Sequence, residues 1–402
     1  MIHLFLNCSA ASAGGGLTYL QNVVPQLSSR SDVRATVAAN RQLLQQIGDL
    51  PNVSWVDFVS GCGAVRRFWR EQAVLPRLVR GSGADVLISA GNFALRKSPV
   101  PQILLSGNSL YTSADFARAL RSRGEYRLRL DTYLKGVIAR RSIHWADCTV
   151  APTQAFAEDL RGWTGAPVTV IHHGFDPETF FRSRDELPHN LQQKLASGQD
   201  SLRLLFVSHY NYYRNFETLI RAIPMLRERL GSRNVKLFLT CALNSTENPG
   251  LYRAEPAAAL VRQLGIADQV VELGTIPYNL LHRIYRACDI YVTPAYAETF
   301  AHPLVEAMAS GLPVVASDLA VHREVCGEAA LYFPRFSPED LAGQVLRIAD
   351  SPALEREMKD SGEKRSREFS WSRHLDQLIA LANQLLSNNG EVGIARRNIS
   401  GQ

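Results

Sequence analysis

The chain has 402 residues, of which 46% are hydrophobic and 20% charged, a composition that excludes a disordered or fibrous protein. Its length predicts two domains, because a single core seldom serves more than about 250 to 300 residues. No apolar run approaches the roughly 20 residues that span a bilayer. The six cysteines are scattered and indicate neither a zinc site nor a disulfide framework, so we expect a cytoplasmic protein.

Positive charge is concentrated in the first part of the chain. The net charge is +6 overall, but residues 1–175 carry 19 Lys and Arg against 11 Asp and Glu, a net +8, which leaves −2 for the rest. Such a bias attracts nucleic acid, anionic lipid or phosphorylated substrates, and composition does not choose among them.

Short β-rich runs alternate with longer helix-like segments, which is typical of parallel sheets covered by helices. In the first half the runs are residues 2–6, 35–39, 53–56, 85–89, 102–106, 148–152 and 168–172. In the second half they are residues 202–208, 235–240, 270–273, 290–294, 313–317 and 330–333. The sequence therefore predicts an α/β fold of two doubly wound units.

A Gly and a Pro interrupt this pattern in HHGFDPETFF, residues 172–181, where we place the domain boundary. We expect domains at 1–175 and 176–385 and a polar tail at 386–402, with the option that the last helix packs back on the first domain. Ligands of such sheets bind beyond the carboxyl ends of the strands, so two facing units would form one cleft.

The first candidate phosphate site is the glycine triplet of SAGGGLTYL. Gly14, Gly15 and Gly16 follow the first strand and open a helix, where backbone can approach a phosphate or a sugar. Tyr19 occupies the position of the third glycine of the dinucleotide fingerprint, so a dehydrogenase is not expected.

The second candidate is the loop SHYNYYRN, residues 208–215. Arg214 could neutralise a diphosphate and His209 could add a hydrogen bond. A surface arginine and a packed histidine at a strand end would explain the same two residues.

The third candidate is AETFAHPLVEAMASGLP, residues 297–313, which contains Glu298 and Glu306. Pro303 suits a first helical position, and Gly311 with Pro313 ends the helix, so we predict a helix over 304–310 with Glu306 in its first turn. Its amino end is an anion site, and carboxylates accept hydrogen bonds from a ribose or a sugar. Alternatively, Glu306 merely favours the helix start and Glu298 is a solvated loop residue.

Together these segments resemble glycosyltransferase family 4, whose members have the two-Rossmann architecture called GT-B. The resemblance is strongest in VVELGTIPYNLLHRIYRACDIYVTPAYAETFAHPLVEAMASGLPVVASDLAVHREVCGEAALYF, residues 270–333, and extends loosely over most of the chain. It implies an acceptor-binding first domain and a donor-binding second domain across a cleft. It also implies retention of anomeric configuration, no metal and no cofactor besides the nucleotide-diphosphate sugar, and the absence of an Asp-x-Asp motif agrees with this.

The resemblance also implies roles for single residues. Glu306 would bind the nucleotide ribose, and Glu298 would face the donor sugar near the reacting carbon. Arg214, His209 and the backbone of Gly15 and Gly16 would stabilise the leaving diphosphate. The sugar and diphosphate would contact backbone of Phe300, Ala301, His302, Leu304 and Val305, and the base would lie beside Gly274, Thr275 and Ile276.

Five positions depart from the family pattern. Ser208 and His209 stand where the family usually has Gly-Arg, Arg214 replaces the usual Lys, and Ala301 replaces a glycine. Asn108 lies near the position of an expected His in the first domain, and we keep it as a catalytic candidate.

The basic segments fit two interpretations. Arg66, Arg67, Arg70, Arg77 and Arg80 surround Phe68 and Trp69, and residues 116–141 add eight cations against two acids. Such helices can dock on an anionic membrane, or they can form a solvated, salt-bridged face. Nucleic acid is not expected, because no binding module is present.

The sequence thus predicts a retaining, metal-independent hexosyltransferase that uses a UDP- or GDP-sugar. We expect a glycan or lipid-linked acceptor in the assembly of cell-surface polysaccharide, lipopolysaccharide or glycolipid. The alternatives are a sugar-nucleotide epimerase of the same architecture and a non-catalytic nucleotide-sugar binding protein. The sequence leaves open which nucleotide, hexose and acceptor are used.

Overall fold

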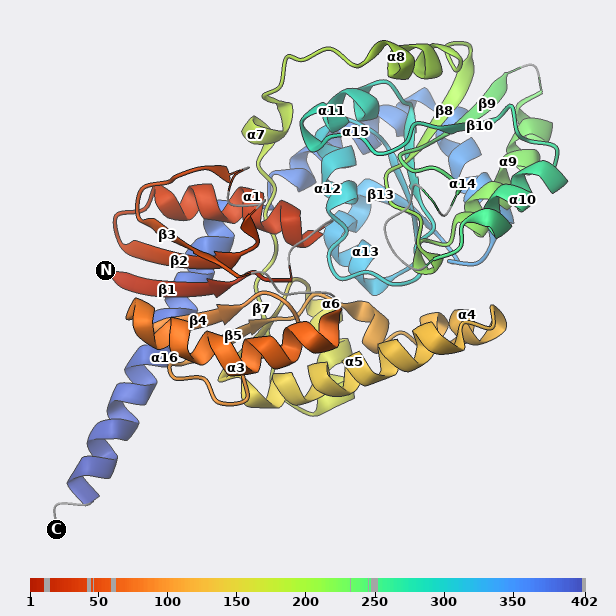
Figure 1. Cartoon of the computed structure of the whole chain (residues 1–402). Helices are drawn as coiled ribbons and strands as arrows, with labels where there is room; N and C mark the ends of the chain where they lie inside the picture. The colour runs from red at the N-terminus through yellow and green to blue at the C-terminus, as the bar shows by residue number, and fades with distance from the viewer. Residues whose placement is uncertain are drawn as a thin grey trace. The chain divides into compact units, whose positions relative to one another are not determined.

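The computed structural model describes residues 1–10, 15–41, 45, 47–58, 63–231, 233–244, 246 and 252–399 (Figure 1). The chain forms two compact units: unit 1 is Met1–Thr112, Arg129–Gly174 and Ser370–Gln402, and unit 2 is Ser113–Leu128 and Phe175–Phe369. The chain passes into the long part of unit 2 one residue before the expected boundary. Residues 113–128 pack with unit 2 although they precede that boundary.

Unit 1 contains a seven-stranded parallel sheet in the order β3-β2-β1-β4-β5-β6-β7, and each expected run of the first half forms a strand. The strands are β1 (Ile2–Asn7), β2 (Val33–Ala39), β3 (Val53–Asp57), β4 (Val86–Ser89), β5 (Gln102–Leu105), β6 (Cys148–Ala151) and β7 (Thr169–Val170). β1 and β4 are almost wholly buried, as expected for parallel strands with helices on both faces.

Helices cover both faces of this sheet. They are α1 (Gly15–Ser28), α3 (Ala64–Ser82), the 3-10 helix η1 (Ser109–Tyr111), α5 (Tyr126–Trp145), α6 (Gln154–Thr164) and α16 (Trp371–Ile399). Leu4 and Leu6 of β1 share a core with α1 and α16, whereas Phe5 packs with Leu75 and Val79 of α3 on the opposite face. This alternation along β1 follows from the two-residue period of a strand.

Helix α16 is an integral part of unit 1. Trp371, Leu375 and Leu378 are buried in the same core as α1, and the buried His374 ring bonds the Tyr19 hydroxyl (3.1 Å) and the His172 carbonyl (2.8 Å). Burial lowers the pKa of His374 to about 4, so this ring is neutral at pH 7. The helix continues to Ile399, so residues 386–399 are helical where the sequence predicted a tail.

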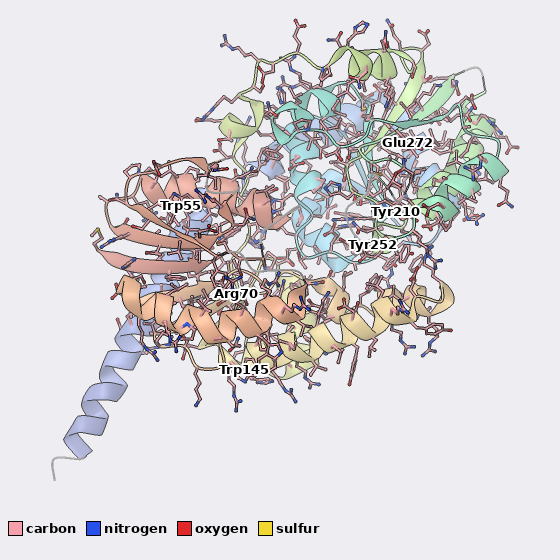
Figure 2. The ribbon with its side chains drawn as sticks, in the orientation of Figure 1. Trp55, Arg70, Trp145, Tyr210, Tyr252 and Glu272 are labelled. Atoms are coloured by element: carbon pink, nitrogen blue, oxygen red, sulfur yellow. The ribbon has the colours of Figure 1, made fainter. Side chains whose placement is uncertain are left out.

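Unit 2 contains a six-stranded parallel sheet in the order β10-β9-β8-β11-β12-β13, again at the six expected runs. The strands are β8 (Ser201–Phe206), β9 (Asn234–Leu239), β10 (Val270–Glu272), β11 (Ile290–Thr293), β12 (Val314–Ser317) and β13 (Ala330–Phe333). Glu272, labelled in Figure 2, accepts the Leu243 N–H (2.8 Å) and so connects the segment after β9 to the end of β10.

Unit 2 has helices on both faces of this second sheet and further helices away from it (Figure 1). They are α4 (Ala114–Ser122), α7 (Pro177–Phe181), α8 (His189–Ala196), η2 (Tyr212–Arg214), α9 (Phe216–Leu230), α10 (Glu255–Gln263), α11 (Tyr278–Arg286), α12 (His302–Ala309), α13 (Ala320–Cys326), η3 (Gly327–Ala329), α14 (Pro338–Ala349) and α15 (Pro352–Ser366). Charged contacts hold the segment 113–128 to other parts of unit 2. These are Arg123 with Glu217 (2.6 Å), Arg253 with Glu125 (2.8 Å) and Arg335 with Asp115 (2.9 Å).

Two further findings concern the described residues as a whole. None of their helices is both long enough and apolar enough to cross a membrane. The five cysteines among them, Cys8, Cys148, Cys241, Cys288 and Cys326, are free thiols.

Gly174, in the chain that leaves the first sheet, lies against the backbone at the start of α16. A Cβ at this position would lie 2.1 Å from the Trp371 nitrogen, which is backbone and cannot rotate away. We expect Gly174→Ala to lower the free energy of unfolding by about 2 to 3 kcal/mol, because it overpacks a rigid contact. Denaturant unfolding followed by circular dichroism measures the change.

Gly162→Ala is the matched control for this prediction. Gly162 lies in α6, and a Cβ there would meet no atom within 4 Å. Alanine at an open helical position stabilises by about 0.5 to 1 kcal/mol. Equal unfolding midpoints for the two variants would show that the Gly174 contact is not restrictive.

Candidate functional site

The strand order of unit 2 reverses between β8 and β11, which are neighbours in the sheet. In a parallel sheet the connections after two such strands leave toward opposite faces, and the crevice between them is the usual ligand site. The connection after β8 contains His209 and Arg214, and the connection after β11 contains Glu298 and leads to α12. The sheet topology therefore brings these sequence candidates to one edge.

Asn215 holds the two connections together. It lies in the left-handed region (φ 54°) after η2, is buried, and donates through Nδ2 to the Pro294 carbonyl (3.1 Å) and the Arg335 carbonyl (2.6 Å). These carbonyls follow β11 and β13 respectively, so one side chain bonds the ends of two other strands. Asn215 was not predicted from the sequence, although a single asparagine between η2 and α9 is a typical left-handed position.

Arg214 and Glu298 form an ion pair through Nη1 and Oε1. Their side chains are 21% and 9% exposed, so the pair is largely withdrawn from water. The guanidinium also lies over the ring of Tyr213, 5.1 Å from its centroid. The structure thus brings together two predicted catalytic residues and gives each an opposite charge as its partner.

His209 lies in the same connection and is half-buried. Burial lowers its pKa, and the nearby positive charge of Arg214 lowers it further. The ring is therefore neutral at pH 7 and can offer a hydrogen bond to a ligand but no charge.

Helix α12 begins at His302, two residues before the predicted start at 304. Ala301 adopts the left-handed region (φ 64°, ψ 65°) just before it, and Pro303 lies within its first two positions. Glu306 consequently lies in the second turn, and its predicted place in the first turn was wrong. Leu304 donates its N–H to the Ala301 carbonyl (2.9 Å) and Pro303 has none, so this end offers fewer free donors than an ordinary helix.

Glu306 is buried, with 4% of the residue exposed. Oε2 accepts a hydrogen bond from the Tyr285 hydroxyl (2.9 Å), whose residue comes from α11. Burial raises the pKa of Glu306 to about 7, and the tyrosine only partly offsets this. A ligand that donated hydrogen bonds to this carboxyl would favour its ionised form. Tyr285 was not among the predicted residues.

His322 is a third residue that was not predicted from the sequence, after Asn215 and Tyr285. Its Nδ1 lies 2.9 Å from the Ser317 carbonyl, and the Ser317 hydroxyl donates to the Ala295 carbonyl. Burial lowers its pKa to about 4, so the ring is neutral. Within the described residues its Nε2 is buried without a hydrogen-bond partner. His322 and Ser317 connect the end of β12 to the segment that follows β11.

The remaining unit 2 candidates lie at the same edge of the sheet. Gly274, Thr275 and Ile276 follow β10, and Gly274 has a φ of 81° that favours glycine. Phe300 is buried, and its ring packs against those of His302 (4.9 Å) and Phe369 (5.2 Å). Leu304 and Val305 are fully buried.

The other candidates belong to unit 1. Gly15 and Gly16 open α1, and Gly14 lies outside the described residues. Asn108 follows β5 and caps η1, its Oδ1 accepting the Leu110 N–H (3.0 Å). Convergence of these residues with those of unit 2 on one ligand stays a prediction.

Unit 1 has its own strand reversal, between β1 and β4, with a buried charge beside it. Glu71 of α3 is 3% exposed, accepts the Ser9 hydroxyl (2.5 Å) and lies 3.3 Å from Nε of Arg67. Burial raises its pKa. Sequence reasoning missed Glu71, although it is the only acidic residue between Arg66 and Arg80.

Within the described residues, no three His, Cys, Asp or Glu side chains gather as a metal site would require. The expected independence from metal stays a prediction.

Family models match both halves of the chain. The model described as Glycosyl transferases group 1 matches residues 189–365, and the model described as Glycosyltransferase Family 4 matches residues 13–179. The D-inositol 3-phosphate glycosyltransferase of Corynebacterium glutamicum is 27% identical over 258 residues, 62% of this chain and 60% of that protein. The chain spans about three-fifths of the length of the curated relatives it matches.

Solved structures share the fold. The sucrose-phosphate synthase of Thermosynechococcus elongatus has a TM-score of 0.76 at 18% identity, over 96% of this chain and 100% of that chain. HepE of Anabaena, in complex with UDP-glucose, has a TM-score of 0.69 at 16% identity, over 96% of this chain and 100% of that chain. The two parallel α/β units are those of the GT-B fold.

The left-handed backbone of Ala301 predicts a stabilising substitution. An L-residue pays about 1 to 2 kcal/mol in this region and glycine does not, so Ala301→Gly should raise the free energy of unfolding by about 0.5 to 1 kcal/mol. Ala307→Gly, in the interior of the same helix, should lower it by about 1 kcal/mol or more. Denaturant unfolding compares the two, and a loss of stability in both variants would contradict the strain at Ala301.

The raised pKa of Glu306 predicts a pH-dependent stability. The pKa is about 7 in the folded chain against 4.5 for the exposed group, so the folded state binds the extra proton between these values. This contribution is present below pH 4.5 and is lost as the pH rises through 7, about 3 kcal/mol in all.

Glu306→Gln should remove that dependence. Unfolding free energies measured from pH 5 to pH 8 should fall less steeply in this variant than in the wild type. Glu228→Gln, at an exposed position of α9, should keep the wild-type slope. A wild-type slope in Glu306→Gln would mean that this carboxyl does not titrate near neutral pH.

Proposed function

We propose that the chain, whose two halves match the models Glycosyl transferases group 1 and Glycosyltransferase Family 4, is a member of glycosyltransferase family 4 that transfers a hexose from a nucleotide-diphosphate sugar to a glycan or lipid-linked acceptor. The observation that carries this proposal is the Arg214–Glu298 pair at the β8/β11 reversal. Arg214 follows β8 and offers a cation for the leaving diphosphate. Glu298 follows the neighbouring strand β11, shortly before the start of α12, and offers a carboxylate for the sugar.

The difficult step of this reaction is departure of the nucleoside diphosphate from the anomeric carbon. Negative charge grows on the leaving phosphate while the sugar acquires oxocarbenium character. Arg214 is a permanent cation whose side chain is partly buried. Its charge therefore stabilises the leaving phosphate more strongly than it would in water. The positive end of α12 adds to the same stabilisation.

Transfer with retention places the acceptor on the face that the diphosphate leaves. The acceptor oxygen forms the new bond to the anomeric carbon as the carbon–oxygen bond to phosphate breaks, and its proton passes to the departing phosphate oxygen. No protein base is required in this scheme. Glu298 would contact the sugar, and the neutral His209 would donate a hydrogen bond to the phosphate or the sugar.

Glu306 would hold the ribose diol. The buried carboxyl gains two hydrogen-bond donors when a diol binds, which favours its ionised form and lowers its pKa again. We further propose that Gly274, Thr275 and Ile276 border the base, and that Asn108, Gly15 and Gly16 of unit 1 contribute to the sugar and phosphate sites. The complex of HepE with UDP-glucose supports testing uridine donors first.

The wider setting is also a proposal. We place the reaction in the cytoplasm, without a metal or a cofactor besides the donor, in assembly of a cell-surface polysaccharide or glycolipid. Release of nucleoside diphosphate only when an acceptor is added supports this function. Epimerised donor without acceptor would favour the epimerase, and tight binding without turnover would favour a non-catalytic binding protein.

Substitution of Glu306 should impair nucleotide binding, whereas substitution of Glu298 should impair turnover. Glu306→Ala should weaken binding of UDP or the preferred nucleotide at least tenfold, about 1.4 kcal/mol, because the diol loses its acceptor. Glu298→Ala should lower turnover by about a hundredfold or more, which is the usual effect of removing one electrostatic contact to a transition state. Its affinity for the nucleotide should change little. Thermal shift with a panel of UDP- and GDP-sugars and a nucleoside diphosphate release assay measure both effects.

Glu228→Ala serves as the exposed carboxylate control in unit 2 and should match the wild type in both assays. Wild-type affinity and turnover in both glutamate variants would overturn these two roles. Wild-type thermal midpoints without ligand would exclude misfolding as the cause of a loss.

A further inference from the structure

An open cavity in unit 2 lies apart from the candidate site. It has a volume of about 700 Å³ and is lined by residues of α7, of the segment that follows α7, of α8 and of α11, which are labelled in Figure 1. Small-molecule sites of proteins usually measure about 300 to 1,000 Å³. The residues that line this cavity include none of the candidate site residues. The cavity is therefore large enough for a ligand of its own.

The cavity and the candidate site lie toward opposite ends of α11. This helix follows β10 and precedes β11, so it runs from the carboxyl edge of the parallel sheet back to the amino edge. Gly274 precedes the start of α11, whereas Arg283 and Arg286 lie in its last turn. A ligand of the cavity is thus distinct from a nucleotide bound beside Gly274.

Three arginines line the cavity, and none of them is paired with an acid. They are Arg184, from the segment after α7, and Arg283 and Arg286 of α11. Within the part of the chain that the structure describes, no ion pair includes any of the three. Three arginines against the one lining acid, Glu186, leave a net charge of +2. An anion would meet positive charge here that the protein does not neutralise.

Contacts within unit 2 hold two of these guanidinium groups in place. Nη2 of Arg283 donates to the Arg184 carbonyl (2.9 Å), and the Arg286 guanidinium lies over the Phe181 ring, 4.6 Å from its centroid. A carbonyl and an aromatic ring orient a guanidinium but do not neutralise it. Donors that remain on such a group bind a phosphate or a carboxylate in a bidentate manner.

Two buried nitrogens of the lining residues have no hydrogen-bond partner within the described residues. They are Nδ1 of His282 and Nε of Arg283. His282 is 3% exposed, and burial lowers its pKa. The charges of Arg283 and Arg286 lower it further, and the nearby backbone of Asn279 offsets this only in part, so the ring is neutral at pH 7. Buried polar groups in folded proteins are almost always paired, and a ligand in the cavity can supply the missing partners.

The other polar side chains of the cavity suit hydroxyl groups. Glu186 and Gln192 are exposed and contribute a carboxylate and an amide. Gln192 donates through Nε2 to the Leu187 carbonyl (2.7 Å), which leaves its Oε1 as an acceptor. Oxygen acceptors of this kind bind the hydroxyls of a sugar. The Arg286 guanidinium occupies one face of the Phe181 ring, so that face is not available to a nucleobase.

We propose that this cavity binds a sugar phosphate. The phosphate contacts Arg184, Arg283 and Arg286, and Glu186 and Gln192 accept hydrogen bonds from the sugar hydroxyls. Inorganic phosphate alone would fill only a small part of the volume of about 700 Å³. This site does not depend on the proposed transfer reaction, since it shares no residue with the candidate donor site.

Calorimetric titration of the full chain tests this site. The probes are glucose 6-phosphate and mannose 6-phosphate, with inorganic phosphate and glucose as partial ligands. We expect at least one of the sugar phosphates to bind about tenfold more tightly than inorganic phosphate, and glucose to bind more weakly still. No binding of either sugar phosphate, or equal binding of inorganic phosphate, would refute a sugar phosphate site.

Two double variants separate the phosphate contacts from the sugar contacts. Arg184→Gln/Arg286→Gln should weaken binding of the sugar phosphates and of inorganic phosphate by about tenfold or more, because two cations are lost. Glu186→Ala/Gln192→Ala should weaken binding of the sugar phosphates by a similar factor, because the hydroxyls lose their acceptors, and should not weaken binding of inorganic phosphate.

Arg356→Gln/Lys364→Gln is the matched control. It removes two exposed cations of α15 and should bind the sugar phosphates as the wild type does. The substituted positions of all three variants are exposed, so each variant should keep the wild-type thermal midpoint, which checks that it folds. Undiminished binding of the sugar phosphates by Arg184→Gln/Arg286→Gln would refute the site.

Competition with UDP distinguishes the cavity from the candidate donor site. Saturating UDP should leave the affinity for the sugar phosphate unchanged, and Arg184→Gln/Arg286→Gln should leave the affinity for UDP unchanged. Displacement of the sugar phosphate by UDP would assign it to the donor site and overturn binding in the cavity. A chain that binds the sugar phosphate but no nucleotide would contradict the proposed function and support the cavity as a site.

Discussion

The pairing of Arg214 with Glu298 is the constraint around which the second unit is organised. Each charge is largely removed from water, so each depends on the other, and truncation of one would leave the other buried and unpaired. A bound diphosphate would offer Arg214 a second anion and change the balance of this pair. A buried ion pair is favourable only when its geometry is fixed, and the contacts around Arg214 and Glu298 fix it.

That geometry comes from bonds among strand ends and not from the pair itself. Asn215 bonds the segments after β11 and β13, Ser317 and His322 connect β12 to β11, and Arg123 with Glu217 holds segment 113–128 beside η2. His209 and His322 are both neutral at pH 7 because of burial. Arg214 thus supplies the permanent positive charge in this group, and neutral partners position it.

The sequence was sufficient for the local elements and insufficient for distant contacts. The thirteen strands found among the described residues were predictable because parallel strands with both faces covered appear as short apolar, β-branched runs. Arg214 and Glu298 could be chosen singly, but their contact depends on β8 and β11 being neighbours. The start of α12 was misplaced because no local rule puts a left-handed alanine at 301. Tyr285 beside Glu306 and Glu71 beside Ser9 were missed because both contacts join residues far apart in sequence. The return of α16 to unit 1 was offered only as an option for the same reason.

The return of α16 affects the order in which the protein can fold during synthesis. Trp371, Leu375 and Leu378 complete the core formed by β1 and α1, yet the ribosome makes them about 200 residues after Gly174. At about 5 to 20 residues per second, the first sheet waits roughly 10 to 40 seconds with one apolar face only partly covered, by α1 without α16. Residues 175–369, the long part of unit 2, are synthesised in that interval. The first unit to emerge is therefore the last to be completed, and it is the one that needs protection from aggregation while nascent.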